Sequence, residues 1–181
     1  MMRLSKSWKP PTRRSAPGGP WIRKPRTASK NSAPGGICRM KVDIRYGAND
    51  DYEWLCENDT YVSSSWVRRC LDHDEYIIAE EEAGILGFIR YSMFWGQIPY
   101  MDLIRVLPSM RRKGIGSAMV KFWENEMRKK SAKILMTSSM ENEPEPQNWH
   151  KRNGFFETGK IGFGILEPVP EVFFVKNLVS A

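Results

Sequence analysis

Hydrophobic residues recur along the chain at two spacings, which together predict a mixed α/β domain after residue 40. Alternating or short continuous apolar runs predict strands over 41–46, 75–80, 85–95, 98–107, 132–137, 155–163 and 172–176. Apolar positions three and four residues apart predict helices over about 50–58, 62–71, 116–130 and 147–152. Short turns join most neighbouring strands, and one helix connects two of them. We therefore expect an α/β (α+β) fold with a mixed, mostly antiparallel sheet of about six to seven strands and about four helices.

The stretch from Asp102 to Lys130 contains a strand, a basic glycine-bearing turn and an amphipathic helix in direct succession. An apolar run stops at Pro108, the sequence R-R-K-G-I-G follows at 111–116, and the helix then begins. The first N–H groups of a helix have no partner inside it, and the helix dipole favours an anion at that end. Gly114 and Gly116 have no side chains that would keep a phosphate away from the backbone. This stretch therefore predicts a phosphate site, although a turn that only starts the helix is the alternative.

The pattern R-x-x-G-x-G between an apolar strand and an amphipathic helix resembles motif A of the GCN5-related N-acetyltransferase (GNAT) superfamily, where it wraps the pyrophosphate of acetyl-CoA. A Walker A sequence, G-x-x-x-x-G-K-[ST], is absent, and a dinucleotide fold would need a third glycine. The resemblance covers residues 41–177 and is most specific in 102–117 and 147–155. It implies the GNAT acyl-CoA N-acyltransferase fold, and an enzyme that transfers an acetyl group from acetyl-CoA to a primary amine by direct attack, with no covalent enzyme intermediate.

The same resemblance implies which residues bind the co-substrate. In GNAT folds the strand before the turn parts from its neighbour, and its free backbone groups bind the pantetheine arm. A backbone N–H at or near Ile104 would then face the thioester oxygen. The predicted cofactor-binding residues are Ile104, Arg105, Val106, Arg111, Arg112, Lys113, Gly114, Ile115, Gly116, Ser117, Asn142 and Trp149.

Asp102 is the candidate general base. A primary amine has a pKa of about 10 in water, so a base assists attack near neutral pH. Asp102 shares strand parity with Ile104 and Val106, which predicts that all three point to one face of the sheet. The alternative is a strand-edge aspartate that faces solvent or pairs with Arg90 or Arg105. The acidic residue that other family members carry on the following strand is missing, since residues 136–139 read M-T-S-S.

His150 is the candidate acid that protonates the CoA thiolate. Family members commonly read N-x-x-A-x-x-[FL]-Y-x-x-x-G-F here, whereas this chain reads Q-N-W-H-K-R-N-G-F over 147–155. The alignment places Trp149 at the bulky position and His150 at the tyrosine, with Asn142 one residue from the upstream asparagine. The sequence W-H-x-x-x-G-F is similar to a variant in some bacterial GNAT proteins. Histidine can donate a proton near neutral pH, but it can equally bind CoA or cap the short helix.

The amine acceptor is not identified by the sequence. The resemblance implies a pocket formed by about 51–71, 90–97 and 161–171, which are rich in aromatic and acidic residues that could hold a cationic amine. A small amine, an amino acid, an aminoglycoside and a protein amine all remain open, and so does a core or surface role for most of these side chains. Two rival functions also stay open: a catalytically weak acyl-CoA-binding sensor module, and a nucleic-acid-associated protein that works through its basic tail.

Charge divides the 181-residue chain into a basic leader, residues 1–39, and a slightly acidic domain, residues 40–181. The leader holds ten Lys/Arg and no Asp or Glu, whereas the rest holds 18 Lys/Arg and 21 Asp/Glu. The leader is rich in Pro, Gly and Ser and repeats S-A-P-G-G, so we expect it to be disordered. Two interpretations of it stay open: it resembles a transit peptide, or it is not native coding sequence and translation naturally begins at Met40. The charge balance of the domain gives no support to nucleic-acid binding by it.

Several functional classes find no support in the composition. The longest apolar runs have strand length, so no membrane span is expected. The three cysteines show no metal-ligand spacing and are odd in number, which favours reduced thiols in a cytoplasmic protein and predicts no metal site. The expected partners are acetyl-CoA and an amine acceptor. A monomer and a homodimer are both compatible with the sequence.

Overall fold

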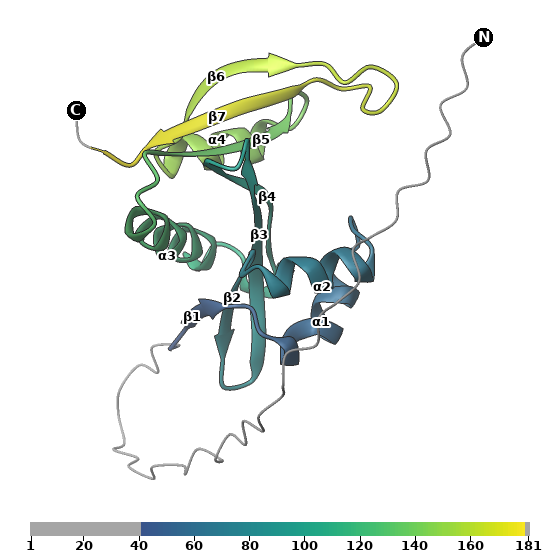
Figure 1. Ribbon diagram of the computed structural model, residues 1–181, viewed down its shortest axis with the longest axis vertical. Helices are drawn as coiled ribbons and strands as arrows, with labels where there is room; N and C mark the ends of the chain where they lie inside the picture. Colours follow the sequence, from purple (N-terminus) through teal and green to yellow (C-terminus); the bar gives the residue numbers. More distant parts are fainter. Residues whose placement is uncertain (1–40, 180–181) are drawn as a thin grey trace. The chain divides into compact units, whose positions relative to one another are not determined.

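The computed structural model describes residues 41–179, and the predictions made for residues 1–39 lie outside this range. Within it, the chain forms a seven-stranded sheet with the order β1-β2-β3-β4-β5-β7-β6 (Figure 1). The strands are β1 (Asp43–Tyr46), β2 (Tyr76–Glu81), β3 (Gly84–Phe94), β4 (Ile98–Val106), β5 (Ile134–Met140), β6 (Phe156–Ile161) and β7 (Glu171–Asn177). Every neighbouring pair is antiparallel except β4 and β5, which run parallel. The predicted mixed, mostly antiparallel sheet is confirmed.

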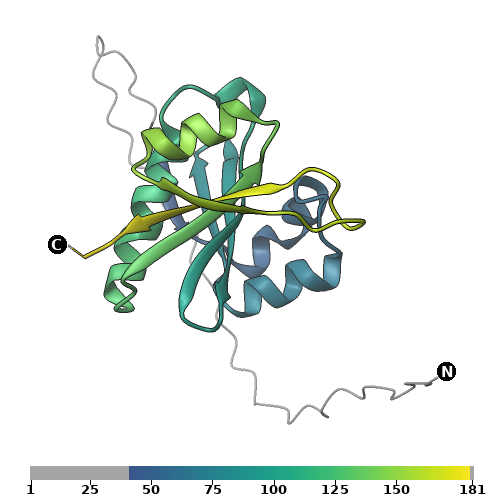
Figure 2. The same cartoon turned by 90° about the horizontal axis from the view of Figure 1, so that it is seen from above.

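Helices cover both faces of this sheet, as two views at right angles show (Figures 1 and 2). The α-helices are α1 (Tyr52–Asn58), α2 (Ser64–Asp72), α3 (Ile115–Lys129) and α4 (Pro144–Arg152), and short 3-10 turns cover η1 (Asn49–Asp51) and η2 (Pro108–Met110). One core cluster joins the sheet to α3 around the fully buried Trp123, with Trp149 of α4 packed against it. A second cluster joins the other face to α1 and α2 around Leu55 and Val67. The four predicted helices are thus confirmed.

Several predicted boundaries differ from the structure by one to three residues, and two of these errors have local causes. The strands predicted over 85–95 and 98–107 left Gly96-Gln97 as a two-residue loop. In the structure Phe94 pairs with Ile98, so the loop has three residues, and its first residue, Trp95, takes a positive φ of 53°. Helix α4 begins at Pro144, three residues before the predicted start at Gln147. Proline is tolerated in the first helical turn, where its missing N–H would have no partner in any case.

Strand β4 is joined to β5 over two residue pairs alone. Tyr100 pairs with Met136 and Met101 pairs with Thr137, whereas β5 stays paired with β7 along its whole length. Beyond Met101 the two parallel strands therefore part, and the later backbone groups of β4 that face β5 have no strand partner. The expectation that this strand parts from its neighbour is confirmed.

A β-bulge in β4 lies at the point of parting. Arg90 of β3 is paired with Leu103 and Tyr91 with Met101, so Asp102 is the extra residue on β4. A bulge leaves its extra residue outside the ladder and re-aims its side chain. This local irregularity decides where the Asp102 carboxylate points.

Candidate active site

The turn before α3 presents a run of unpartnered backbone donors. Within residues 41–179, the N–H groups of 112 to 117 have no hydrogen-bond acceptor, and α3 has no side-chain N-cap. Gly114 adopts the left-handed region with φ 82°, and Arg112 also takes a positive φ of 64°. A Cβ built on Gly114 would meet no atom within 4 Å. Unpartnered N–H groups at a helix start, with open space before them, form an anion-binding site.

This turn borders a cleft of about 740 Å³ between β4, the start of α3 and α4. Ten of the twelve predicted cofactor-binding residues line it: Ile104, Arg105, Val106, Arg111, Arg112, Gly114, Ile115, Gly116, Ser117 and Trp149. Lys113 and Asn142 do not line it. The Lys113 ammonium lies 3.5 Å from the Met110 sulfur, and Asn142 lies in the turn before α4. The structure thus brings most of the predicted binding set to one place.

Two arginines of the predicted set direct their side chains to backbone carbonyls. Nη1 of Arg105 donates to the carbonyl of Asn58 at the end of α1 over 2.6 Å, and Nε of Arg111 donates to the carbonyl of Val106 over 3.1 Å. The Arg105 guanidinium is therefore engaged on the α1 side, and Arg105 offers the cleft its backbone. Arg111 keeps its terminal nitrogens available while its Nε secures the end of β4.

The second glycine of the turn lacks a side chain for a different reason than expected. A Cβ on Gly116 would lie 3.1 Å from Cζ2 of Trp149 and 3.6 Å from Cδ1 of Ile104. The sequence suggested that both glycines make room for phosphate. In the structure Gly116 makes room for the Trp149 ring, which closes the back of the cleft, whereas only Gly114 faces open space.

The bulge turns Asp102 away from the face that its strand parity predicted. Ile104 and Val106 pack with the α3 cluster, but Oδ1 of Asp102 accepts a hydrogen bond from Ser92 Oγ at 3.0 Å, and Oδ2 lies 3.8 Å from Nε of Arg90. The prediction that the three side chains share a face was wrong, because the extra residue shifts the alternation by one.

The local environment of Asp102 weakens its acidity. Its side chain is 23% exposed. Burial raises its pKa to about 6, and the Ser92 hydrogen bond and the Arg90 charge only partly oppose that rise. A carboxylate with a pKa near 6 is ionised at neutral pH yet is a stronger base than an ordinary aspartate.

His150 lies at the back of the cleft in an aromatic environment. Its ring centroid is 5.4 Å from those of Trp149 and Phe174, the residue is 4% exposed, and its Nδ1 has no hydrogen-bond partner within the described part of the chain. Burial lowers its pKa to about 4, while a hydrogen bond with the Ser138 backbone acts in the opposite direction. The imidazole is therefore neutral near pH 7.

Helix α4 supplies cleft residues that the sequence reasoning did not single out. Glu145, Pro146, Asn148 and Arg152 line the cleft together with Met110 of η2. Glu145, Asn148 and Arg152 follow helical spacing, so they share one face of α4. A helix start at Pro144 would have revealed that face, but the shorter predicted helix hid it.

The predicted acceptor side contains both buried and exposed members. Asp59 and Tyr91 are buried, so a core role is the outcome for them. Tyr61 and Trp66, near the start of α2, are exposed, and the β6–β7 connection exposes Ile165. In both views that connection and the α1–α2 connection extend to the same side of the sheet (Figures 1 and 2).

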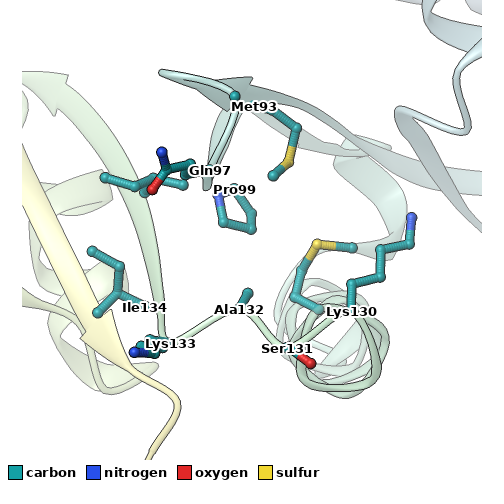
Figure 3. A pocket seen from close by; sticks show the side chains of 11 residues that line it. Met93, Gln97, Pro99, Lys130, Ser131, Ala132, Lys133 and Ile134 are labelled. Atoms are coloured by element: carbon teal, nitrogen blue, oxygen red, sulfur yellow. The ribbon is translucent and has the colours of Figure 1, made fainter.

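A second cavity, of about 450 Å³, lies at the opposite end of β4. Pro99 and Met93 face it from the β3–β4 hairpin, and residues Lys130 to Ile134 border it after α3 (Figure 3). None of the predicted catalytic or cofactor-binding residues lines it, but Met93, Gly96 and Gln97 belong to the segment 90–97 that was predicted for the acceptor pocket. Within residues 41–179, no group of three or more His, Cys, Asp or Glu side chains could hold a metal ion, and no helix is long and apolar enough to cross a membrane.

Comparison with known proteins yields one family and many structural relatives. The model of the Acetyltransferase (GNAT) family matches residues 42–155, which is more than half of the chain. Among curated proteins none matches. Three solved structures illustrate the shared fold.

The first is a GNAT-family acetyltransferase from Bacillus cereus, with 20% identity, 77% of this chain and 99% of that chain covered, and a TM-score of 0.63. The second is the ribosomal-protein-alanine N-acetyltransferase from Brucella melitensis, at 19% identity, 74% and 98% coverage and a TM-score of 0.63. The third, yncA from Salmonella typhimurium, was solved with its cofactor acetyl-CoA; it shows 15% identity, 77% and 95% coverage and a TM-score of 0.64. At these sequence identities the solved structures show only that the fold is shared. The family model, together with the parted strands and the basic turn, shows that this chain belongs to the GNAT family of acetyltransferases.

Proposed function

We propose that this protein transfers the acetyl group of acetyl-CoA to a primary amine. One observation carries the proposal: β4 parts from β5 immediately before a turn in which the N–H groups of 112 to 117 have no acceptor. This arrangement offers an unpaired strand edge next to an anion site, which suits a molecule with an amide-bearing arm and a pyrophosphate. The acetyl-CoA bound to the Salmonella relative supports the same ligand here.

The chain's own residues would hold the co-substrate along the cleft. The backbone of Ile104 to Val106 would pair with the pantetheine amides, because this edge of β4 has no strand partner. The turn amides would hold the pyrophosphate, and the terminal nitrogens of Arg111 and the Arg112 side chain would add positive charge. Trp149 would close the cleft behind the arm, since its ring already packs over Gly116.

Transfer would proceed by direct attack of the amine on the thioester. The amine nitrogen forms a bond to the carbonyl carbon, and the carbon–sulfur bond breaks to release the CoA thiolate. Asp102 would take the proton that the amine loses, directly or through a water, because its Oδ2 accepts no hydrogen bond within the described residues. A backbone N–H at or near Ile104 would stabilise the developing oxyanion, a contribution of about 3 kcal/mol where measured.

His150 would act at the thiolate end of the site. The single N–H of the neutral imidazole is engaged with the Ser138 backbone, so Nδ1, which has no partner within the described residues, would have to take up a proton before it could donate to the thiolate. A negative charge that develops nearby would favour this uptake, because it raises the pKa that burial holds at about 4. We expect His150→Gln to reduce turnover more than the affinity for CoA. Equal turnover in that variant would assign His150 to packing alone.

A catalytically weak acyl-CoA-binding module is the second candidate. The observation that favours it is the burial of His150, which leaves the site without a protonated acid near pH 7. Both candidates require CoA binding, so turnover separates them.

The deciding experiment has two stages and uses the full chain. Calorimetric titration of acetyl-CoA measures binding, and release of free CoA thiol is then followed against a panel of amines. Micromolar binding with thiol release for one amine class establishes the enzyme. Binding without release for any amine favours the binding module, and failure to bind removes the basis of both candidates.

A further inference from the structure

A buried ion network extends behind the candidate base and crosses three strands. Oδ2 of Asp59, at the end of α1, accepts hydrogen bonds from Nη1 of Arg90 at 2.5 Å and from the hydroxyl of Tyr76 at 2.7 Å. Asp59 is 0% exposed and Arg90 is 7% exposed. The same guanidinium turns its Nε toward Oδ2 of Asp102 at 3.8 Å. One arginine is therefore shared between the fully buried carboxylate of Asp59 and the partly exposed carboxylate of Asp102.

The network is built to hold Arg90 in place. Asp59 follows the last turn of α1, where the helix dipole disfavours a negative charge, and Arg90 and Tyr76 both donate hydrogen bonds to its carboxylate. Two buried atoms, Oδ1 of Asp59 and Nε of Arg90, have no hydrogen-bond partner within residues 41–179. The unpartnered Nε is the donor that faces Asp102, so the fold directs an unused donor at the candidate base.

We propose that Arg90, anchored by Asp59, is a positioning residue that orients the Asp102 carboxylate and sets its charge state. This inference rests on the proposed function, in which Asp102 takes a proton from the amine. An arginine with Asp102 as its sole partner would stabilise the carboxylate so strongly that it became a weak base. Because Asp59 already offsets much of the guanidinium charge, Asp102 keeps an ionised form that still accepts a proton readily.

The arrangement also suits the state after proton transfer. Once Asp102 is neutral, Arg90 would be a buried charge without a partner if Asp59 were absent, and an uncompensated buried charge is costly. With Asp59 in place the pair Asp59–Arg90 remains neutral in sum. Asp102 can therefore gain and lose a proton while the rest of the network stays as it is.

Other charged groups near Asp102 are already paired or are neutral. Arg69 of α2 forms an ion pair with Glu75, which precedes β2. Burial raises the pKa of the Tyr100 hydroxyl, which hydrogen-bonds the hydroxyl of Ser138, so Tyr100 stays neutral. Arg90 is thus the group near Asp102 whose net charge effect a single substitution can either strengthen, by removing Asp59, or abolish, by removing Arg90 itself.

The test is a pair of substitutions with opposite expected effects. Asp59→Asn leaves the Arg90 charge without its counter-ion, so the Asp102 titration should move about one pH unit lower; Arg90→Gln removes the positive charge, so it should move about one unit higher. Tyr76→Phe removes a hydrogen bond from the same buried network without changing its charge, and it should leave the titration in place. General loosening of the fold would shift the two charge variants in the same direction.

The measurement is carbon-13 NMR of carboxyl-labelled aspartate in the full chain without ligand, with the Asp102 signal assigned by Asp102→Asn. Opposite shifts support the proposal, and an unmoved Asp102 titration in Asp59→Asn overturns it even if Arg90→Gln fails to fold. The pH profile of kcat/KM is then recorded for the same variants. If the NMR titration shifts while the acidic limb of that profile stays fixed, the network controls Asp102 but Asp102 is not the base, which refutes the proposed function at that residue only.

Discussion

The two ends of the candidate site are built in different ways. At the turn the candidate binding groups are backbone N–H groups of six consecutive residues, and Gly114 leaves open space in front of them. Around Asp102 the working groups are side chains that come from β2, β3, β4 and the end of α1. If the two ends act as proposed, a change at the turn would act through volume and charge next to the bound anion, whereas a change at the cluster would act through the proton affinity of Asp102.

Replacing the candidate base should give the largest effect and tests the side-chain end directly. We expect Asp102→Asn to lower kcat/KM on the order of a hundredfold to ten-thousandfold, because general-base catalysis typically contributes that much. The affinity for CoA, measured by calorimetry, should stay within severalfold of the wild type. Wild-type turnover in this variant would remove the chemical distinction between the two ends.

A matched pair of substitutions at Gly114 tests the backbone end. Asparagine and aspartate have nearly the same volume, and both tolerate the left-handed conformation that Gly114 adopts with φ 82°. Gly114→Asp should bind CoA on the order of a hundredfold more weakly than Gly114→Asn, because like charges about 4 Å apart cost several kcal/mol near a protein surface. Equal CoA affinities in calorimetry would mean that no anion binds at this turn.

The buried His150 should make stability depend on pH. Its pKa is about 4 in the folded chain against 6.5 ordinarily, so the unfolded chain takes up a proton first as the pH falls. The stabilisation is complete above pH 6.5 and is lost between pH 6.5 and 4, by about 3 kcal/mol. In urea unfolding, the change in stability between pH 7 and pH 4 should be about 3 kcal/mol less favourable in the wild type than in His150→Gln.

The comparison with His150→Gln matters because Asp102 acts in the opposite direction. Burial raises the pKa of Asp102 to about 6, so its ionisation reduces stability as the pH rises through the same window. Asp102 is present in both proteins and cancels in the difference. An identical pH dependence in the two proteins would indicate that His150 titrates normally.

The smallest effect is expected at the packed glycine. Gly116→Ala places a Cβ 3.1 Å from Cζ2 of Trp149, so the ring must shift by a few tenths of an ångström. We expect a stability loss of about 1 kcal/mol in thermal or urea unfolding and a severalfold loss of CoA affinity. A loss as large as that of Gly114→Asp would show that Gly116, too, approaches the phosphate.

The turn before α3 is predicted well from the sequence and the Asp102 cluster is not, because the first depends on local spacing and the second on contacts between distant residues. The turn lies within a few residues, so local spacing predicts its strand, glycines and helix, and the structure places them as expected. The position of Asp102 depends on a bulge that no periodicity reveals, since alternation alone puts it on the face of Ile104. The network of Asp59 with Arg90 joins residues far apart in the chain, so only the folded chain brings them together. The start of α4 was hidden by its two prolines, which local propensity counts against a helix.

The short contact between β4 and β5 has a mechanical consequence. Strands β1 to β4 form one half of the sheet and β5 to β7 form the other. Two residue pairs between β4 and β5 make up the hydrogen-bonded ladder that joins the halves. A ligand that pairs with the free edge of β4 would lie where β4 and β5 have parted, and it would connect the two halves of the sheet. We therefore expect the sheet to be more rigid with CoA bound than without it. The amide hydrogens of β4 beyond Met101 should then exchange with solvent far more slowly in the CoA complex.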